Sequence, residues 1–500
     1  VLIGKLLGRK GNGINSLAIA ALAMLLYNPG YLIDPGFQLS FAATWGLVYL
    51  VPVLCPQKLK LPEQVKEAIF FPVAAQLATL PLLAYYFNQI SLVGIVANIL
   101  VTWFLAIILE VGLVALSLGA LIGAIGHFLL IPLVYVIKLC TWLLESMARI
   151  PGAAFWVITP PIWLVGLYYL GLYTWINRVS LQDKLEASLG TKTKKYLLRN
   201  ASTWICISIL ICGLLLTSLS LGLPRNKLLE VEFLDVGQGD SILISTPSGK
   251  HYLLDGGPRS DKFDTGKAIL LPYLFSKGIK GLDGVILSHP HDDHSGGLVE
   301  IMNSLKVSCY FIAGVDYQYQ EPGWWQSLEK EVAENNVPIR KLSAGQTLEL
   351  DKNLLVKVLS PLAPFVGTHS DPNNNSLVLE LSYGKQSFLL TGDIELEAIQ
   401  ELKNQKLRTT SIIKIPHHGS KYGLDKELFD RLNPPLVIIS VGKNNAFGQP
   451  APVVSEYWKS RNIPVLRTDQ DGLIKLSTDG ENLSVRIGRE QRLLKIKNIQ

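Results

Sequence analysis

Long apolar runs are the feature that most constrains this chain, and they are confined to its first half. The 500 residues are 49% hydrophobic but only 17% charged, which is too apolar for an ordinary soluble enzyme of this length. Residues 14–223 consist of one apolar run after another, whereas the sequence from Lys227 onward has the composition of a normal globular domain. A run of about 18 apolar residues is long enough to cross the hydrocarbon core of a membrane. The pattern therefore predicts a polytopic α-helical membrane domain followed by a soluble domain.

The apolar half contains about eight candidate membrane spans. Their number is open because residues 91–150 contain few polar breaks. We expect a membrane domain over residues 1–225, a soluble domain over residues 228–490 and a short basic tail over residues 491–500. Since the chain begins at Val1 without a recognisable signal peptide, we interpret it as truncated at its N-terminus. The candidate spans lie near residues 15–33, 37–55, 68–87, 91–112, 113–135, 130–149, 160–177 and 201–223.

The distribution of basic residues predicts the orientation of the chain in a membrane. The loop between the last two candidate spans carries six Lys and Arg residues between Arg178 and Arg199. Short basic loops of this kind stay in the cytoplasm. The last span, residues 201–223, would then place the soluble domain on the opposite, extracytoplasmic side. Arg225 and Lys227, directly after that span, favour the reverse orientation.

Several polar side chains interrupt the predicted spans, where an unpaired polar group is costly. Gln38, Gln76 and Asn98 are the candidates for lining a polar channel. Glu110 and Glu145 also fall in apolar stretches, but close to span ends. For any one of these residues, hydrogen bonding between neighbouring helices is the favoured alternative.

A dense group of metal-binding residue types lies in the soluble half. Residues 289–294 read His-Pro-His-Asp-Asp-His, after an apolar run at 284–288 and before Gly296 and Gly297. This pattern predicts a strand, a polar loop and the start of a helix. Alternation at a strand end would direct His289 and His291 toward one site, with Asp293 and His294 returning from the loop. Imidazole nitrogen and carboxylate oxygen are ligands of zinc and similar divalent ions, so we expect a metal centre here.

Other acidic and histidine residues follow predicted strands of the same half. Asp393 ends the apolar run at 388–391, and His417 and His418 follow the run at 411–415. Taken alone, Asp393 is typical of a turn or a helix cap. Paired histidines after a buried strand are more often ligands than surface residues, and the spacing does not decide which of the two coordinates. A turn at residues 247–250 also predicts a hairpin that ends near Asp255.

Three separate stretches resemble the ComEC family of DNA-internalisation proteins from natural competence. Residues 34–41, Asp-Pro-Gly-Phe-Gln-Leu-Ser-Phe, follow Asn28-Pro29 and resemble the signature of that family's membrane domain. Two prolines and two glycines there prevent a continuous helix. Residues 91–100 resemble a second part of the same domain, and Leu-Asp-Val-Gly-Gln-Gly-Asp-Ser at 234–241 resembles the opening of its metallo-β-lactamase domain. The resemblance covers nearly the whole chain and lacks the small N-terminal domain common in the family.

The resemblance implies an αββα sandwich for the soluble half, with metal ligands at strand ends along one edge. It further implies two divalent ions, zinc or manganese, with Asp393 bridging them and His417 or His418 completing the site. His289 and His291 would hold one ion, and Asp293 and His294 the other. Asp293 is the candidate catalytic residue that orients the attacking hydroxide. Asp235 and Asp255 are expected to organise loops beneath the metal rather than to bind it.

Two departures from related enzymes concern the surroundings of the metals. Many metallo-β-lactamase enzymes supply a further histidine between the cluster and the bridging aspartate, where this chain has an asparagine run at 373–375. Asn374, Asn375, water or His369 are the alternatives for that position. Gln449 stands where ComEC proteins usually have a histidine, which predicts slower catalysis or altered metal preference. The main cluster is intact, so an active enzyme is expected.

The resemblance implies a function in DNA uptake during natural transformation. The membrane domain would pass single-stranded DNA inward through the bacterial inner membrane, while the exterior domain degrades the other strand of double-stranded DNA delivered by other competence proteins. One alternative is a membrane-tethered metallohydrolase of a small ester or phosphate, and another is a non-catalytic DNA-binding channel protein.

A group of aromatic residues either stacks on unpaired bases or serves as a core or membrane anchor. It comprises Tyr310, Tyr317, Tyr319, Trp324 and Trp325.

Overall fold

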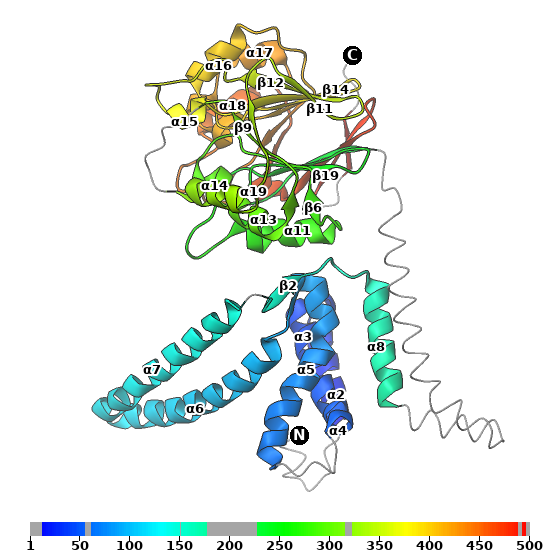
Figure 1. Ribbon diagram of the computed structural model, residues 1–500, viewed down its shortest axis with the longest axis vertical. Coiled ribbons are helices and arrows are strands. Elements are labelled where there is room, and N and C mark those ends of the chain that lie inside the picture. The colour runs from blue at the N-terminus through cyan, green and yellow to red at the C-terminus, as the bar shows by residue number, and fades with distance from the viewer. Residues whose placement is uncertain are drawn as a thin grey trace, which may run out of the picture. The chain divides into compact units, whose positions relative to one another are not determined.

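The computed structural model describes most of the chain and divides it into two compact units. The described residues are 13–55, 62–150, 152–177, 228–315, 323–488 and the backbone of 493–496. The units comprise residues Val1–Gly222 and Leu223–Gln500, and each is considered by itself below (Figure 1). The basic loop and the last candidate span, on which the predicted orientation depends, lie outside the described residues.

The first unit is built of apolar helices. Three of its described helices, α5, α6 and α7, are long and apolar enough to cross a membrane. A helix rises about 1.5 Å per residue, so the 28 residues of α6 span roughly 42 Å. The unit contains α2 (Gly13–Tyr27), η1 (Pro29–Ile33), α3 (Pro35–Tyr49), α4 (Val51–Leu54), α5 (Glu63–Phe87), β1 (Gln89–Ser91), α6 (Gly94–Leu121), α7 (Gly123–Ala148), β2 (Ala154–Trp156) and α8 (Ile162–Ile176).

The predicted helix break at residues 28–36 is confirmed. Asn28 Oδ1 accepts a hydrogen bond of 2.9 Å from the backbone N–H of Gly30 and caps η1. Asp34 Oδ1 accepts one of 2.7 Å from the N–H of Phe37 and caps α3. Each proline stands in the first turn of the helix that follows, where a missing N–H costs nothing. The break is therefore made of two consecutive capped helix starts.

The region from 91 to 149 differs from the prediction, which placed three spans there. It forms two longer helices, α6 and α7, and Pro132 lies inside α7 rather than at a boundary. The chain breaks only at Ile122, which is extended (φ −139°, ψ 95°). Apolar composition identifies membrane-compatible sequence but does not locate a turn between two apolar helices, so the three-span division was wrong.

Small residues allow neighbouring helices of this unit to approach closely. A Cβ added to Gly46 in α3 would lie 2.6 Å from Ala78 Cβ in α5. A Cβ added to Gly126 in α7 would lie 2.4 Å from Gly119 Cα in α6. Side chains larger than hydrogen at these positions would separate the helices, as is common where helices pack in membranes.

The second unit is a sandwich of two mixed β-sheets. Parallel neighbours such as β5 and β7, or β14, β15 and β16, bring their carboxyl ends to a common edge. One sheet has the order β10 (Ile339–Leu342), β9 (Tyr310–Ala313), β7 (Gly284–Ile286), β5 (His251–Leu254), β4 (Ile242–Ser245), β3 (Leu229–Phe233), β18 (Ile474–Thr478), β19 (Leu483–Ile487) and β20 (Leu493–Ile496). The other has the order β11 (Thr347–Asp351), β12 (Leu354–Ser360), β13 (Val378–Tyr383), β14 (Gln386–Leu390), β15 (Ile412–Lys414), β16 (Leu436–Ile439) and β17 (Val465–Arg467). A separate short pair joins β6 (Gly281–Leu282) and β8 (Lys306–Val307).

The main hydrophobic core lies between the two sheets. Val231 and Phe233 of β3 and Val356 and Val358 of β12 belong to one buried cluster. Period-two alternation directs these side chains inward. Glu232 takes the opposite face of β3, where Lys277 and Lys475 pair with it. The predicted αββα sandwich is thus the observed fold, with helices outside both sheets.

Helices cover the outer face of each sheet (Figure 1). Phe429 and Trp458, from two of these helices, pack with Ile413 and Val437 in a second buried cluster outside the β14–β17 region. The helices on this side include α16 (Leu396–Lys403), α17 (Lys426–Leu432) and α18 (Pro452–Ser460). On the other side lie η2 (Gly266–Leu270), α11 (Leu271–Ser276), α13 (Leu298–Ser304) and α14 (Trp324–Glu334). Short segments between strands and helices are α12 (Asp292–Ser295), α15 (Asp371–Asn374), η3 (Pro416–Gly419), η4 (Lys421–Gly423) and α19 (Thr468–Asp471).

Candidate metal centre

The histidine cluster follows the carboxyl end of β7, as the strand–loop–helix pattern predicted. His289 is fully buried, and its Nε2 lies 3.0 Å from Nδ1 of His291. The chain then enters α12, which carries Asp293 and His294. Two imidazole nitrogens therefore face each other on the loop, and a second pair of ligand types begins the helix.

Four potential ligands from three segments converge beside this pair. They are Asp293 and His294 of α12, Asp393 after β14 and His418 in η3 after β15, and one ligand atom of each lies within 4.8 Å of the others. Asp393 Oδ2 is 3.2 Å from His294 Nε2 and 3.1 Å from His418 Nε2. His418 Nε2 is also 3.2 Å from Asp293 Oδ2. Residues that are 125 positions apart in sequence thus meet at one edge of the sandwich.

The structure separates the two neighbouring histidines of η3. Both adopt left-handed backbone conformations, with φ of 48° at His417 and 53° at His418. The turn buries His418 among the potential ligands and leaves His417 partly exposed, with its Nδ1 3.2 Å from Glu395 Oε1. Such backbone conformations are unfavourable for non-glycine residues and are retained where the surroundings enforce them. His418 is therefore the candidate ligand of the two.

Hydrogen bonds to the outer nitrogens of the histidines fix their orientation. Asp255 Oδ2 accepts from His294 Nδ1 at 2.8 Å and from Ser288 Oγ at 2.7 Å, while its Oδ1 accepts from the N–H of Ser288 at 2.8 Å. The backbone oxygen of Ser440 accepts from His418 Nδ1 at 2.9 Å. Contacts of this kind hold the Nε2 atoms toward a metal position. A second group of potential ligands comprises Asp240, Asp255 and His294. The expectation that Asp255 supports the site rather than binds metal therefore stays a prediction, and Asp235 lies outside both groups in the described residues.

Sequence reasoning missed a buried lysine and its partner aspartate. Lys414, the last residue of β15, is 1% exposed and pairs with Asp240 and, at 3.2 Å, with Asp393 Oδ1. Its ammonium also donates a hydrogen bond of 2.7 Å to the backbone oxygen of Gly392. Buried lysines are rare unless paired, so a lysine inside the apolar run at 411–415 was the available signal. Lys414 leaves Asp393 Oδ2 as the oxygen that faces the histidines.

Charges within the cluster shift its ionisation strongly. Burial raises the pKa of Asp393, but His418, His294 and Lys414 outweigh burial and hold that pKa well below its usual value. Burial lowers the pKa of His418, yet Asp393 and Asp293 outweigh it and raise the pKa to about 10. Burial is also the largest cause of the lowered pKa of His289. The metal-free site therefore combines ionised carboxylates with protonated and neutral imidazoles.

The donor set fits a divalent metal ion. His294 Nε2 is buried without an aligned hydrogen bond to any described residue, although Asp393 and Asp293 lie beside it. Nitrogen and carboxylate oxygen at this spacing suit zinc and other divalent ions. The group of Asp293, His294, Asp393 and His418 offers four potential ligands to one ion. In the described residues, His289 and His291 belong to neither group of potential ligands, so their role as ligands stays a prediction.

Comparisons with known proteins agree with both halves of the structure. Residues 1–182 match the family described as Competence protein, and residues 234–443 match the Metallo-beta-lactamase superfamily. The chain joins a competence-protein domain to a metallo-β-lactamase domain. It is 29% identical to ComE operon protein 3 of Bacillus subtilis over 493 residues, which are 95% of this chain and 59% of that protein.

Other competence relatives match with similar coverage. Competence protein ComA of Neisseria gonorrhoeae is 24% identical over 465 residues, which are 91% of this chain and 57% of that protein. The chain therefore spans less than two thirds of the length of these relatives. Among solved structures, a diphosphatase from the PhnP family (14% identity, TM-score 0.30) matches over 50% of this chain and 98% of its own. Zinc-bound PqqB from Methylobacterium extorquens (12% identity, TM-score 0.33) matches over 50% of this chain and 99% of its own.

The asparagine run of the metallo-β-lactamase domain is engaged in local structure. Asn374 Oδ1 accepts hydrogen bonds of 3.1 and 3.2 Å from the N–H groups of Glu395 and Ala398 at the start of α16. Asn375 bonds both the N–H and the oxygen of Phe365. These contacts occupy the amides that sequence reasoning considered as metal or supporting groups.

His369, the histidine alternative for the same position, pairs with a buried glutamate. Its Nδ1 lies 2.7 Å from Glu395 Oε2, and its side chain is 53% exposed. Glu395 also lies beside His417, so the two histidines share one carboxylate. In the described residues, His369 belongs to neither group of potential metal ligands.

Gln449 joins two loops at the edge of the metal centre. Its Oε1 accepts a hydrogen bond of 2.6 Å from Gln238 Nε2, and Gln238 Oε1 accepts one of 3.1 Å from the N–H of Gly442. Gln238 belongs to the loop before β4, whose Asp240 N–H donates to Asp293 O at 3.2 Å. The residue thus connects the loop after β16 to the loop that contacts α12.

The predicted channel residues lie on the helices of the competence domain. Gln38 Nε2 donates to Leu32 O at 2.7 Å, and its Oε1 accepts from Tyr86 of α5 at 3.0 Å, a contact between helices. Gln76 of α5 approaches the start of α6, where a Cβ at Gly94 would lie 3.8 Å from its Oε1. Asn98 is an exposed residue of α6. A role in a channel stays a prediction for all three.

The predicted aromatic group is only partly described. Trp324 begins α14, and its backbone N–H donates to Asp292 Oδ1 at 2.7 Å. The guanidinium of Arg259 lies 4.4 Å from the centre of its ring, a cation–π contact. Tyr310 is buried in β9, while Tyr317 and Tyr319 lie outside the described residues. Trp324 is therefore positioned beside α12 of the metal centre.

Proposed function

We propose that this chain takes up DNA during natural transformation, with its metal centre cleaving phosphodiester bonds of the strand that is not transported. The observation that carries the proposal is the convergence of Asp293, His294, Asp393 and His418 in a chain that also contains a competence-protein domain. The competence relatives support a role in DNA uptake, and the metallo-β-lactamase domain supports metal-dependent hydrolysis. Cleavage, strand choice and transport are the steps proposed beyond these.

The metal centre would hold two divalent ions, zinc or manganese. His289 and His291 would bind one ion, while Asp293, His294 and His418 would bind the other, with Asp393 shared between them. When bound, divalent ions of this kind activate water and offset the charge that develops on an attacked phosphoryl group. The protein positions them through Asp255 and Ser440, which hold the outer nitrogens of His294 and His418.

Asp293 is the residue proposed to orient the attacking water. Its side chain is 33% exposed, whereas those of His294, His418 and Asp393 are almost completely buried. Burial raises the pKa of Asp293, but His294 and His418 outweigh it and lower the pKa to about 2. The side chain therefore stays a carboxylate at neutral pH and can accept a hydrogen bond from water at the open side of the site.

The proposed partners follow from transport by the membrane domain and cleavage by the metal centre. Double-stranded DNA would arrive from other competence proteins, single-stranded DNA would pass through the membrane domain, and lipid would surround α5, α6 and α7. We propose the bacterial inner membrane as the location, with the metallo-β-lactamase domain on the extracytoplasmic side. The channel candidates are Gln38, Gln76 and Asn98.

Uptake of labelled DNA by competent cells tests the proposal. Cells would depend on this chain in place of the resident competence protein and receive double-stranded DNA with a different label on each strand. We expect one strand inside the cells and fragments of the other in the medium. His291→Ala should abolish the fragments, and Gln38→Ala should lower internalisation. Normal uptake by wild-type cells with the non-transported strand intact would contradict the nuclease role and favour a non-catalytic channel. Absence of uptake would favour a tethered small-molecule hydrolase.

A further inference from the structure

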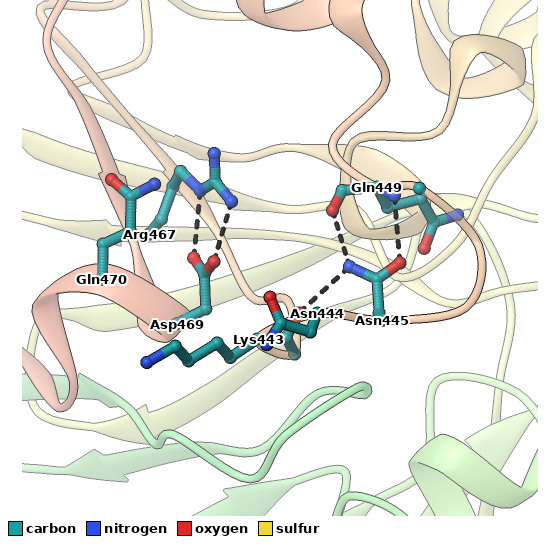
Figure 2. A pocket seen from close by; sticks show the side chains of 9 residues that line it. Lys443, Asn444, Asn445, Gln449, Arg467, Asp469 and Gln470 are labelled. Carbon is teal, nitrogen blue, oxygen red and sulfur yellow. Dashed lines mark hydrogen bonds and ion pairs between the residues drawn. The ribbon is translucent and has the colours of Figure 1, made fainter.

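A polar pocket lies in the second unit, on the loop that follows β16. Its volume is about 630 Å³, and its lining comes from two segments, the loop after β16 and the turn that includes α19. Figure 2 shows the side chains of Lys443, Asn445, Gln449, Arg467 and Asp469 around it. None of these residues belongs to either group of potential metal ligands in the described residues.

The loop that forms the pocket is attached to the metal centre at both ends. At its start, Ser440 O accepts a hydrogen bond from His418 Nδ1 at 2.9 Å. At its end, the N–H of Ala451 donates to Gly419 O at 2.8 Å, directly after His418. Lys443 is three residues beyond Ser440, so its Cα lies within about 11 Å of Ser440 Cα at roughly 3.8 Å per residue. The pocket lining therefore begins within a few residues of a contact to His418.

The loop is held in shape by its own amides. Asn445 Nδ2 donates to Gly442 O at 3.0 Å and to Gln449 O at 2.6 Å, and its Oδ1 accepts from the N–H of Gln449 at 3.0 Å (Figure 2). Gln449 Oε1 accepts from Gln238, which leaves the Gln449 amide nitrogen as a donor without a recorded acceptor among the described residues. Hydrogen bonds within the loop therefore fix the shape of the pocket that it lines.

The charge of the lining favours an anion. Arg467 Nε and Nη2 donate to the two oxygens of Asp469 at 3.0 and 2.8 Å, which occupies the only carboxylate in the lining. Lys443 is exposed, and it has no ion-pair partner within the described part of the chain. Two cations and one anion leave a net charge of +1 in the lining. The lining therefore offers an unpaired ammonium and amide donors, but no free carboxylate that would repel a phosphate.

We propose that this pocket binds a backbone phosphate of single-stranded DNA, next to the phosphodiester bond that the metal centre cleaves, with the Lys443 ammonium as its charged contact. The inference rests on the proposed nuclease function, because the same strand must occupy both places. Lys443 acts as a binding residue, and it takes no part in bond cleavage. Contact with a phosphate carries no base information, so binding is independent of DNA sequence.

The test measures binding separately from cleavage in the full chain purified in detergent. Fluorescence anisotropy follows a labelled oligothymidylate on a His289→Ala background, and Lys443→Gln is compared with Lys352→Gln, which removes an exposed lysine outside the pocket lining. Loss of one phosphate contact should raise the Kd roughly three- to tenfold and lower the salt slope of log K by about 0.7. Lys352→Gln should change neither quantity.

Cleavage by the otherwise wild-type chain completes the test. Lys443→Gln should raise the KM for single-stranded DNA and leave kcat within about twofold. Lys443-dependent binding without any cleavage would support the pocket and contradict the nuclease. Cleavage and binding that are both indifferent to Lys443→Gln would overturn the pocket and leave the nuclease standing. Absence of oligonucleotide binding to the wild-type chain would also overturn the pocket.

Discussion

Buried contacts to one atom of a side chain orient its other polar atom in the metal centre. Lys414 holds Asp393 Oδ1, and Asp255 holds His294 Nδ1, so the remaining atoms Oδ2 and Nε2 face each other at 3.2 Å. Neither supporting contact touches the open side of the site. The orientation of the ligands is therefore built into the protein before a metal arrives.

Replacing Asp255 by asparagine tests this support at the residue scale. Asp255 accepts three hydrogen bonds through two oxygens, one from His294 and two from Ser288. An amide has only one oxygen to accept them, so His294 would lose its fixed orientation. We expect Asp255→Asn to weaken zinc binding roughly 10- to 100-fold. Asp351→Asn, at the end of β11 in the same domain and outside both groups of potential ligands, is the matched control. Competition with a fluorescent zinc chelator measures the zinc affinity of both variants. Equal zinc affinities of Asp255→Asn and Asp351→Asn would contradict the supporting role of Asp255.

The ionisation of His418 predicts how metal binding depends on pH. Its pKa is raised to about 10, since Asp393 and Asp293 outweigh the effect of burial. Below that pH the metal-free imidazole is protonated, and it must lose the proton to bind metal. We therefore expect zinc binding at about pH 7 to release protons and the apparent affinity to rise from about pH 6 to about pH 8. Calorimetry in buffers of different ionisation enthalpy measures the release, and a pH-independent affinity would contradict this charge state.

At the scale of elements, the loop between β3 and β4 positions α12. Gly239 has a φ of 142°, and a Cβ there would lie 2.2 Å from Asp293 O. Gly237 also has a positive φ, 82°, but a Cβ there meets nothing within 4 Å. Substitution of the two glycines therefore distinguishes backbone strain from a direct clash with α12, which carries Asp293 and His294.

Alanine at each glycine tests the contact. Gly237→Ala should cost about 1–2 kcal/mol of stability from the unfavourable φ alone and leave metal binding intact. Gly239→Ala should cost more, because it forces the loop away from α12, and it should weaken metal binding. Thermal unfolding with and without zinc distinguishes the two variants. Equal metal affinities in both would show that the loop does not position Asp293.

The sequence predicted those elements of the site that carry a local signal. His289, His291, Asp293 and His294 lie together in six residues, and the prolines at 29 and 35 mark a helix break. Asp240 and Lys414 had no such signal, since their pairing depends on two segments 174 positions apart in sequence that meet only in the folded sandwich. His417 and His418 could not be told apart, because a left-handed turn decides which one is buried. The two helices at 91–149 were divided wrongly for a similar reason, as uniform apolarity hides a turn.

At the scale of the whole molecule, the proposed function divides transport and cleavage of DNA between the two units. The first unit supplies three described helices able to cross a membrane, and the second supplies a group of potential metal ligands. The predicted orientation depends on the basic loop at 178–199, which lies outside the described residues. Orientation is therefore best measured directly.

Labelling of a single cysteine tests the side of the membrane. A variant without its five native cysteines and with Lys352→Cys presents one exposed thiol in the metallo-β-lactamase domain. We expect a membrane-impermeant maleimide to label it in intact spheroplasts, because the domain is proposed to be extracytoplasmic. A cysteine in the basic loop, Lys194→Cys, should react only after permeabilisation. The reverse pattern would place the metal centre in the cytoplasm.

Metal-dependent cleavage of DNA by the purified full chain is the decisive test of the proposed nuclease function. The chain is freed of metal, supplied with Mn²⁺ or Zn²⁺ and given single- or double-stranded DNA. We expect cleavage that requires added metal and that falls at least about 1000-fold in His291→Ala, while Lys352→Gln remains fully active. Folded wild-type protein that binds metal but leaves both forms of DNA intact would contradict it.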